Sequence, residues 1–328
     1  MPGTGTRTFV EPERYEESLR SVQVQLVVTS PGEFKARLTW AELHHLQLLR
    51  GEEDLPRIAF LSLPPRLVFV GFPMVTTAST MWRGTELQAG DVVLNNIGER
   101  LHQVTTGPST WSLIALEPAL LEEYGRVLLG RPLSPAQQGQ VLRPTPRDAA
   151  RLRRLHTQAC RLALTKPKIL THPEVARAIE HDLVYALVSC LAAAKVRVER
   201  AAKRRPALIM VRFEEVLAEH PGQPPRLPEL CAKIGVTERT LRSCCAEFLG
   251  ISPTRYMLLR RLKQVRAALR DADTATANVA ELARQFGFSQ LGRFSGAYRA
   301  AFGESPSATL RRVAAPRFTS PANFVKSA

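Results

Sequence analysis

The chain has 328 residues, of which 45% are hydrophobic and 23% are charged. This length and composition suit two globular domains and exclude a single small binding module. The formal net charge of +15 indicates a polyanionic partner, either nucleic acid or an anionic membrane surface.

The beginning of the chain is rich in Gly, Pro, Thr and charged side chains, so we expect a mobile arm over residues 1–20. This segment lacks the apolar core of a signal peptide. The longest apolar run covers residues 183–194, which is shorter than the roughly 20 residues that cross a bilayer. We therefore expect a cytoplasmic protein with no membrane partner.

Residues 21–118 contain short apolar or alternating runs separated by turn residues, a pattern that predicts an antiparallel β domain. The runs are VQVQLVV, FKARLTW, LPRIAFLSL, LVFVGF, DVVLNNI and WSLIALE. The segment 84–104, GTELQAGDVVLNNIGERLHQV, resembles the strand and glycine turns of cupin-like sensor domains. This resemblance implies a β-barrel that senses an effector.

The spacing of the histidines in this domain gives no sign of a metal site. Cupins that hold a metal use a His-x-His pair with a glutamate and a later histidine, whereas His44 and His45 are adjacent and His102 stands alone. Neighbouring residues on a strand point to opposite faces. We therefore expect no metal and no cofactor, and we interpret these histidines as strand or pocket-lining side chains.

Several large apolar side chains of the β domain are candidates for effector binding. A barrel with a wide interior can use them to bind a small apolar or amphipathic molecule, although such residues also pack simply as core. The candidates are Phe60, Phe69, Phe72, Met81, Trp82, Leu94 and Trp111.

From residue 119 the pattern becomes helical, with helices predicted over residues 147–164 and 173–198. The second helix carries an apolar face at steps of three and four residues. This face consists of Val175, Ile179, Leu183, Ala186, Leu187, Cys190 and Leu191. It can pack within its own domain or form a homodimer, so we predict a dimerisation or sensor-associated region over residues 119–198. The basic segment 199–206 follows as an interdomain linker.

Residues 227–253 and 279–306 share the same order of apolar, glycine, hydroxyl and Ser-Pro positions. They form an internal repeat with a period of about fifty residues. Each copy contains a short apolar helix, a glycine, a hydroxyl residue placed to cap, and an amphipathic helix that ends at a glycine followed by Ser-Pro. This order predicts one helix-turn-helix in each copy, joined by a long helix over residues 253–270.

The spacing of the two copies resembles the paired helix-turn-helix region of AraC/XylS-type transcription regulators. The resemblance implies a DNA-binding domain over residues 207–314, a flexible tail over residues 315–328, and an α+β chain overall. It also implies an effector-responsive regulator that inserts two recognition helices in successive major grooves. The implied partners are a double-stranded DNA operator, a small-molecule effector, a second copy of the chain and, for an activator, RNA polymerase.

In the first copy we expect Thr237 to cap a recognition helix over residues 238–249, whose exposed arginines can hold guanine with two donors. In the second copy we expect Ser289 as the cap. Because Gly292 and Gly296 take exposed positions there, we expect this helix to read fewer bases. The predicted DNA-binding residues are Thr237, Glu238, Arg239, Arg242, Ser243, Lys263, Ser289, Gln290, Arg293, Ser295 and Arg299.

Two other functions fit parts of the sequence: a metal-cupin or thiol enzyme fused to a DNA-binding module, and a helix-turn-helix used only for protein contact. A thiol enzyme needs a cysteine activated by a basic neighbour. The spacing of the five cysteines shows no such arrangement and no CxxC pair; they are Cys160, Cys190, Cys231, Cys244 and Cys245. We predict no catalytic residue and interpret the cysteines as buried apolar side chains, with redox sensing by the adjacent Cys244 and Cys245 as the alternative.

Overall fold

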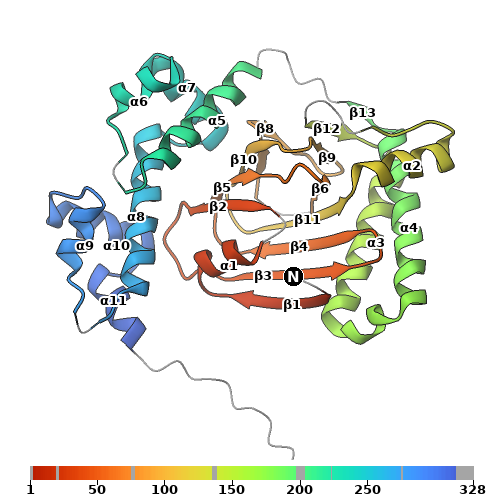
Figure 1. Ribbon diagram of the computed structural model, residues 1–328, viewed down its shortest axis with the longest axis horizontal. Helices are drawn as coiled ribbons and strands as arrows, with labels where there is room; N and C mark the ends of the chain where they lie inside the picture. Colours follow the sequence, from red (N-terminus) through yellow and green to blue (C-terminus); the bar gives the residue numbers. More distant parts are fainter. Residues whose placement is uncertain are drawn as a thin grey trace, which may run out of the picture.

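A computed structural model describes residues 3–19, 22–74, 78–134, 139–196, 204–222, 224–274 and 276–314. Within these ranges the N-terminal part forms two antiparallel β-sheets and the C-terminal part is helical (Figure 1). The chain is therefore a mixed α+β protein, as predicted. Both strand orders are open in the described part of the chain, so the predicted barrel is not a closed one.

The first sheet has the order β1-β3-β4-β11-β6-β9-β12-β13. Its strands are β1 (Thr4–Phe9), β3 (Ala36–Glu42), β4 (Gln47–Glu53), β11 (Ser109–Leu116), β6 (Val68–Pro73), β9 (Val92–Asn95), β12 (Gln140–Arg143) and β13 (Lys195–Val196). The second sheet has the order β2-β5-β10-β7-β8, with β2 (Gln23–Val28), β5 (Arg57–Ser62), β10 (Arg100–Thr105), β7 (Thr80–Trp82) and β8 (Thr85–Glu86). Each of the six apolar runs overlaps one of these strands.

The second sheet is buried on both faces. Because successive side chains on a strand alternate between faces, Ala59 and Leu61 of β5 point toward the first sheet. Ile58 and Phe60 of the same strand point the other way, toward the C-terminal helices. The strand consequently reads as a continuous apolar run.

Helices cover the opposite face of the first sheet (Figure 1). They are α2 (Pro118–Leu129), α3 (Pro146–Thr165), a 3-10 helix (Pro167–Thr171) and α4 (Pro173–Ala192). Leu183 and Leu187 of α4 are fully buried in one cluster with Leu152 of α3 and Ile114 of β11. The apolar face of α4 therefore packs inside the subunit and is not a free dimer surface, and the helix ends at Ala192, short of residue 198.

The first residues are not an isolated arm over the part that the structure describes. All six residues of β1 pair with β3, and α1 (Pro12–Ser18) follows. Tyr15 of α1 is fully buried, and its hydroxyl donates a hydrogen bond to Glu53 at 2.9 Å. The prediction of a mobile arm was wrong for residues 4–18 because the Gly and Thr residues here form a paired edge strand.

The C-terminal helices lie beside the second sheet (Figure 1). They are α5 (Arg204–Glu219), α6 (Leu227–Ile234), α7 (Glu238–Leu249), α8 (Pro253–Asp271), α9 (Val279–Gln285), α10 (Leu291–Phe302) and α11 (Pro306–Ala314). Most of the predicted linker and the whole of the predicted tail lie outside the described residues. Among the described helices, none has the length and apolar character that a membrane span requires.

Apolar contacts join the second sheet to the C-terminal helices. Val27, Ile58 and Val104 belong to the same buried cluster as Phe213 of α5 and Tyr256 of α8. This continuity means that the face of the second sheet opposite the first sheet is part of the core of the helical domain.

We expect His156 of α3 to make the protein sensitive to acid. It is fully buried and donates a hydrogen bond to the carbonyl of Leu113 at 3.2 Å. Burial, helped by the charge of Arg50, lowers its pKa from 6.5 to about 4. A histidine whose pKa is lower in the folded state contributes stability above the unfolded value and loses it as the pH falls toward the folded value. The expected loss between pH 6.5 and about 4 is on the order of 3 kcal/mol.

Urea unfolding across this pH window tests the prediction. His156→Gln keeps an N–H donor but cannot titrate, so its free energy of unfolding should depend less steeply on pH than that of the wild type. His172→Gln is the matched control, because His172 is exposed. Equal pH dependence in wild type and His156→Gln contradicts the assignment.

Candidate nucleic-acid interface and internal cavity

A tight turn joins helices α6 and α7, and the bounds of both helices agree with the sequence. Gly235 follows α6 with a φ of 78°, a left-handed conformation that glycine adopts without strain. Val236 N–H then donates to the carbonyl of Cys231 at 3.0 Å, which closes the turn. Thr237 caps α7 by accepting a hydrogen bond from Thr240 N–H at 3.2 Å.

One face of α7 is packed and the other is free. Leu241, Cys245 and Phe248 are buried against the neighbouring helices, whereas Arg239 and Arg242 are exposed. Arg242 pairs with Glu238 at 2.9 Å, but both side chains are about half exposed, so the pair contributes little. Ser243 is exposed on the same face. Arg239 and Arg242 on this face carry N–H donors of the kind that can contact guanine in a major groove.

Helices α9 and α10 are also joined by a short turn with a glycine. Gly287, with a φ of 76°, makes the turn, and Phe288 N–H donates to the carbonyl of Ala283 at 3.0 Å. The cap of α10 is Gln290, without a side-chain cap bond. The prediction of Ser289 as the cap was therefore wrong by one residue; Ser289 lies exposed in the turn.

The exposed face of α10 is flatter than that of α7. A Cβ added at Gly292 or Gly296 would meet no atom within 4 Å, so both positions border open space. The polar side chains that remain exposed along this helix and its turn are Ser289, Gln290, Arg293, Ser295 and Arg299. The helix thus offers charge at its ends and no side chain at two central positions.

The basic residues of α8 are mostly used inside the molecule. Lys263 pairs with Glu16 of α1, and Arg270 pairs with Glu13 at 3.3 Å and Glu11 at 3.4 Å. The structure therefore places Lys263 against the β domain and not beside the exposed faces of α7 and α10. Its charge is matched by an acidic helix that lies more than two hundred residues earlier in the chain.

A buried carboxylate joins the two parts of the molecule and was missed in the sequence. Glu214 of α5 is 1% exposed and accepts a hydrogen bond from Tyr256 at 2.6 Å. It also contacts Nε2 of His102 at 2.7 Å and pairs with Arg260. The available signal was its position on α5, next to Phe213 on the apolar face, where an unpaired carboxylate is costly.

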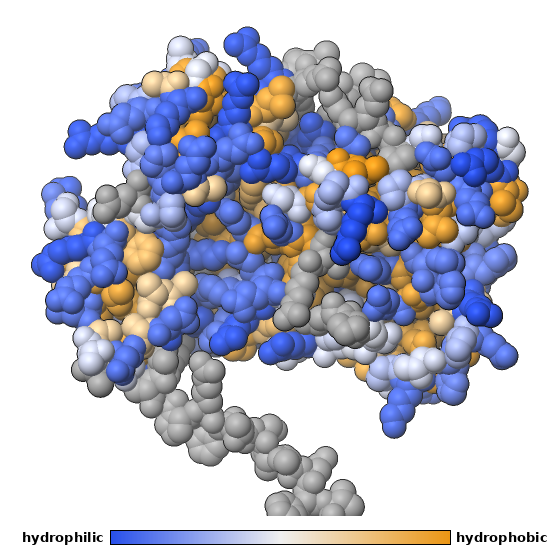
Figure 2. Space-filling model, viewed as in Figure 1, coloured by the Kyte–Doolittle hydropathy of each residue, from blue (hydrophilic) through white to orange (hydrophobic). Residues whose placement is uncertain are grey.

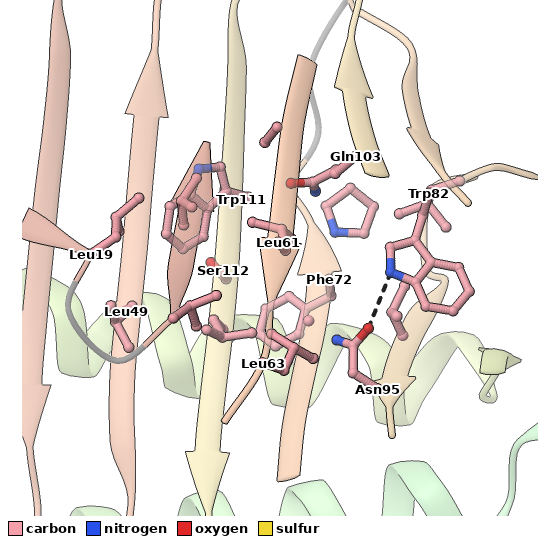
Figure 3. Close-up of a pocket in the computed structure, with 18 of the residues that line it drawn as sticks. Leu19, Leu49, Leu61, Leu63, Phe72, Trp82, Asn95, Gln103, Trp111 and Ser112 are labelled. Atoms are coloured by element: carbon pink, nitrogen blue, oxygen red, sulfur yellow. Dashed lines mark hydrogen bonds between the residues drawn. The ribbon is translucent and has the colours of Figure 1, made fainter. Parts of the chain in front are cut away.

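The two sheets enclose a cavity of about 100 Å³ (Figure 3). Most of its wall is apolar, with Trp82 and Trp111 on opposite sides, and the indole of Trp82 donates to Asn95 at 3.2 Å. Glu53, Arg57 and Gln103 supply a polar region.

Within that polar region, Arg57 donates to Glu53 at 2.8 Å, and both side chains are at most 2% exposed. Ser112 also borders the cavity, and its buried hydroxyl has no hydrogen-bond partner among the described residues. The site therefore combines an apolar slot with a fixed charged pair and a free hydroxyl.

Of the seven residues predicted to line an effector cavity, the structure brings Phe72, Trp82 and Trp111 to this one. The other four lie elsewhere. The ring centroid of Phe60 is 4.9 Å from that of His102, and Met81 packs on the helical core. Phe69 is packed in the core between the sheets, and Leu94 faces α3 and α4. Alternation explains three of these errors, since both faces of each strand are apolar and the sequence does not tell them apart.

The cysteines have the character of buried structural residues. All five are buried and free. Burial raises the pKa of Cys160 and of Cys190 to about 12, and it also raises the pKa of Cys244 and Cys245. A raised pKa removes the thiolate that a nucleophile requires, so this geometry gives no support to a thiol enzyme.

Comparisons with known proteins relate this chain to transcription regulators. Residues 230–312 match a family model described as a helix-turn-helix domain. The chain is 33% identical over 153 residues to the probable thc operon regulatory protein of Rhodococcus erythropolis, a match that covers 46% of each protein. It is 39% identical over 87 residues to the XylDLEGF operon transcriptional activator of Pseudomonas putida, covering 26% of each.

The matches thus span about a quarter to a half of the length of these relatives. Among solved structures, the AraC-like transcriptional activator CuxR superposes with a TM-score of 0.42 and 15% identity, over 86% of this chain and 100% of that one. The match to the family model lies within the helical domain.

Proposed function

From the premise that the chain carries a C-terminal helix-turn-helix domain of the AraC/XylS type, we propose that it is an effector-responsive, sequence-specific DNA-binding transcription regulator. The observation that carries the proposal is the exposed face of α7, where Arg239 and Arg242 stand on a helix fixed by a buried core. The net charge of +15 supports a nucleic-acid partner.

In this proposal α7 and α10 are two recognition helices of two helix-turn-helix motifs, joined by α8 and placed in successive major grooves. The DNA-binding domain covers residues 207–314, and residues 21–118 form a cupin-like sensor of which residues 119–198 are the helical continuation. The exposed apolar side chains of Val127 and Leu128 on α2 support a homodimer through that helix. Figure 2 shows small hydrophobic areas scattered among hydrophilic ones on the face that it draws. Contact with RNA polymerase belongs to the proposal only for an activator.

The cavity between the sheets is the proposed effector site. Its apolar walls suit a small organic molecule, and the free hydroxyl of Ser112 and the amide of Gln103 offer polar contacts. Genome-wide mapping of bound DNA identifies the neighbouring genes and hence metabolites to test. Quenching of the fluorescence of Trp82 and Trp111 then measures binding of each compound. If a compound alters DNA binding but leaves this fluorescence unchanged, the effector site does not lie in the cavity.

We expect α7 to read more sequence than α10. Arg239→Ala and Arg242→Ala should each relax the preference at particular base pairs, because a bidentate arginine supplies about 1–3 kcal/mol of discrimination. Arg299→Ala should weaken binding to specific and nonspecific DNA alike and reduce the salt slope by about one ion. Competition binding with a systematic operator-substitution series measures both effects.

Arg37→Ala is the matched control for Arg242→Ala. Arg37 lies on β3, away from α2 and from the C-terminal helices, is 46% exposed and pairs with Glu52, as Arg242, 54% exposed, pairs with Glu238. The control should bind DNA like the wild type. If base discrimination is equal or greater over the half-site covered by α10, the unequal reading is wrong and the backbone at Gly292 and Gly296 approaches the bases instead.

A further inference from the structure

The turn between β3 and β4 brings two histidines together on the surface. His44 and His45 lie in this turn, which is closed by a hydrogen bond from Leu43 N–H to the carbonyl of Leu46 at 2.9 Å. Their ring centroids are 4.0 Å apart. The expectation that they point to opposite faces was wrong, because alternation holds on a strand and these residues lie beyond the end of β3.

A buried carboxylate of α4 completes the group. Glu180 is 7% exposed and offers an oxygen to the histidines, so that one ligand atom from each of the three residues lies within 4.8 Å of the others. Its Oε2 accepts hydrogen bonds from the backbone N–H of His45 at 2.7 Å and of Leu46 at 3.2 Å. Among the described residues these are the hydrogen bonds found for this carboxylate, and both are accepted by Oε2.

The group borders an open pocket of about 460 Å³ between the turn, α2 and α4. The pocket is also lined by His181, which follows Glu180 on α4, and by Glu123 of α2. These two residues add an imidazole and a carboxylate, both of which can bind a cation. Arg177 lines it as well, but that side chain is exposed and can remain in solvent. The pocket is separate from the cavity between the sheets.

We propose that His44, His45 and Glu180 bind a divalent transition-metal ion of the zinc type. Imidazole nitrogens and a carboxylate oxygen are ligands that Zn²⁺ takes at about 2.0–2.2 Å, with tetrahedral geometry. Ligand atoms around one such ion are about 3.3 Å apart, so small rotations of the two exposed imidazoles complete the site. His181 or water supplies the fourth ligand. The two backbone N–H bonds hold the carboxylate as an outer-shell support does.

A bound ion would tie the β3–β4 turn to α4 and thereby fix the first sheet on the helices behind it. The test uses full-length protein without a histidine tag, stripped with a chelator and titrated with Zn²⁺ by calorimetry and with Co²⁺ by visible absorption. We expect one equivalent to bind, with the absorption of tetrahedral Co²⁺. His44→Ala and His45→Ala should each weaken the affinity by about 100-fold, at least as much as loss of an outer-shell partner.

Two further variants separate metal binding from a structural role. Glu180→Gln keeps an amide oxygen for the backbone N–H groups of the turn, so it should unfold like the wild type and yet lose metal affinity. His172→Ala removes an exposed histidine outside the group and should bind like the wild type. If His44→Ala and His45→Ala bind as the wild type does, or if His172→Ala loses as much affinity, the proposal is wrong. The readout is metal occupancy, so it does not depend on whether the protein binds DNA.

Discussion

Replacing Glu214 by glutamine is expected to lower the free energy of unfolding by about 3 kcal/mol, because it leaves Arg260 and His102 facing a neutral group in a buried site. The carboxylate contacts His102 at 2.7 Å and Tyr256 at 2.6 Å, and its side chain is 1% exposed. Glutamine has nearly the same shape, so the loss reports charge and hydrogen bonding. Urea unfolding of the full chain measures the change.

Glu215→Gln is the matched control on the same helix. Glu215 pairs with Arg100, but its side chain is 45% exposed and that of Arg100 is 34% exposed, so the expected loss is below about 1 kcal/mol. Similar losses in the two variants contradict a special role of Glu214.

The charge state of Glu214 also gives the sign of a pH effect. Burial by itself raises its pKa, but the hydrogen bond and charge of His102, the charge of Arg260 and the hydroxyl of Tyr256 together bring the pKa below 4.5. A carboxyl with a lowered folded pKa contributes stability above its unfolded value, which is lost as the pH falls through the folded value. The loss at Glu214 begins near pH 4.5, where most of the loss at His156 has already occurred, because the window of His156 runs from pH 6.5 to about 4.

Glu53→Ala is expected to destabilise the β domain by about 3–5 kcal/mol, since it leaves the buried Arg57 without its counter-ion. Glu53 accepts hydrogen bonds from Tyr15 at 2.9 Å, Trp111 at 2.8 Å and Arg57 at 2.8 Å. All three donors lose their acceptor together. Thermal and urea unfolding measure the loss.

Glu52→Ala serves as the control from the adjacent position on β4. Its side chain is 35% exposed and pairs with Arg37 at 3.3 Å and Arg50 at 3.1 Å, so its loss should stay near 1 kcal/mol. The double variant Glu53→Gln, Arg57→Met removes both charges and should be more stable than Glu53→Ala. If the double variant is the less stable of the two, uncompensated charge is not the cause.

The parts of the fold that sequence predicted best are those with local causes. The bounds of α6 and α7 agree with the sequence because Gly235 and Thr237 specify the turn and the cap within a few residues. The exposed face of α7 followed from the same periodicity. At α10 the sequence predicted Ser289 as the cap, whereas the structure has Gln290 at that position. Ser289 has a hydroxyl group that suits a cap, but it lies one residue too early in the chain.

The parts that were missed depend on contacts between distant segments. Glu16 and Lys263 are 247 residues apart, and each alone looks like a solvated surface charge. His102 and Glu214 are 112 residues apart, and no sequence pattern links them. Phe60 was wrongly assigned to the cavity for a related reason. It faces away from the cavity because the C-terminal helices bury the other side of β5, which no feature of β5 itself reveals.

The second sheet is the single layer of strands that separates the cavity from the helical domain. Ala59 and Leu61 touch one side while Ile58 and Phe60 touch the other, and neighbours on a strand are only about 3.3 Å apart. If a molecule in the cavity moves β5 outward by a fraction of an ångström, the surface on which α5 packs moves by a similar amount. Close-packed side chains leave no empty space that could take up the movement. The cavity and the helical domain contact opposite faces of the same strand, so coupling between them requires no further residues in between.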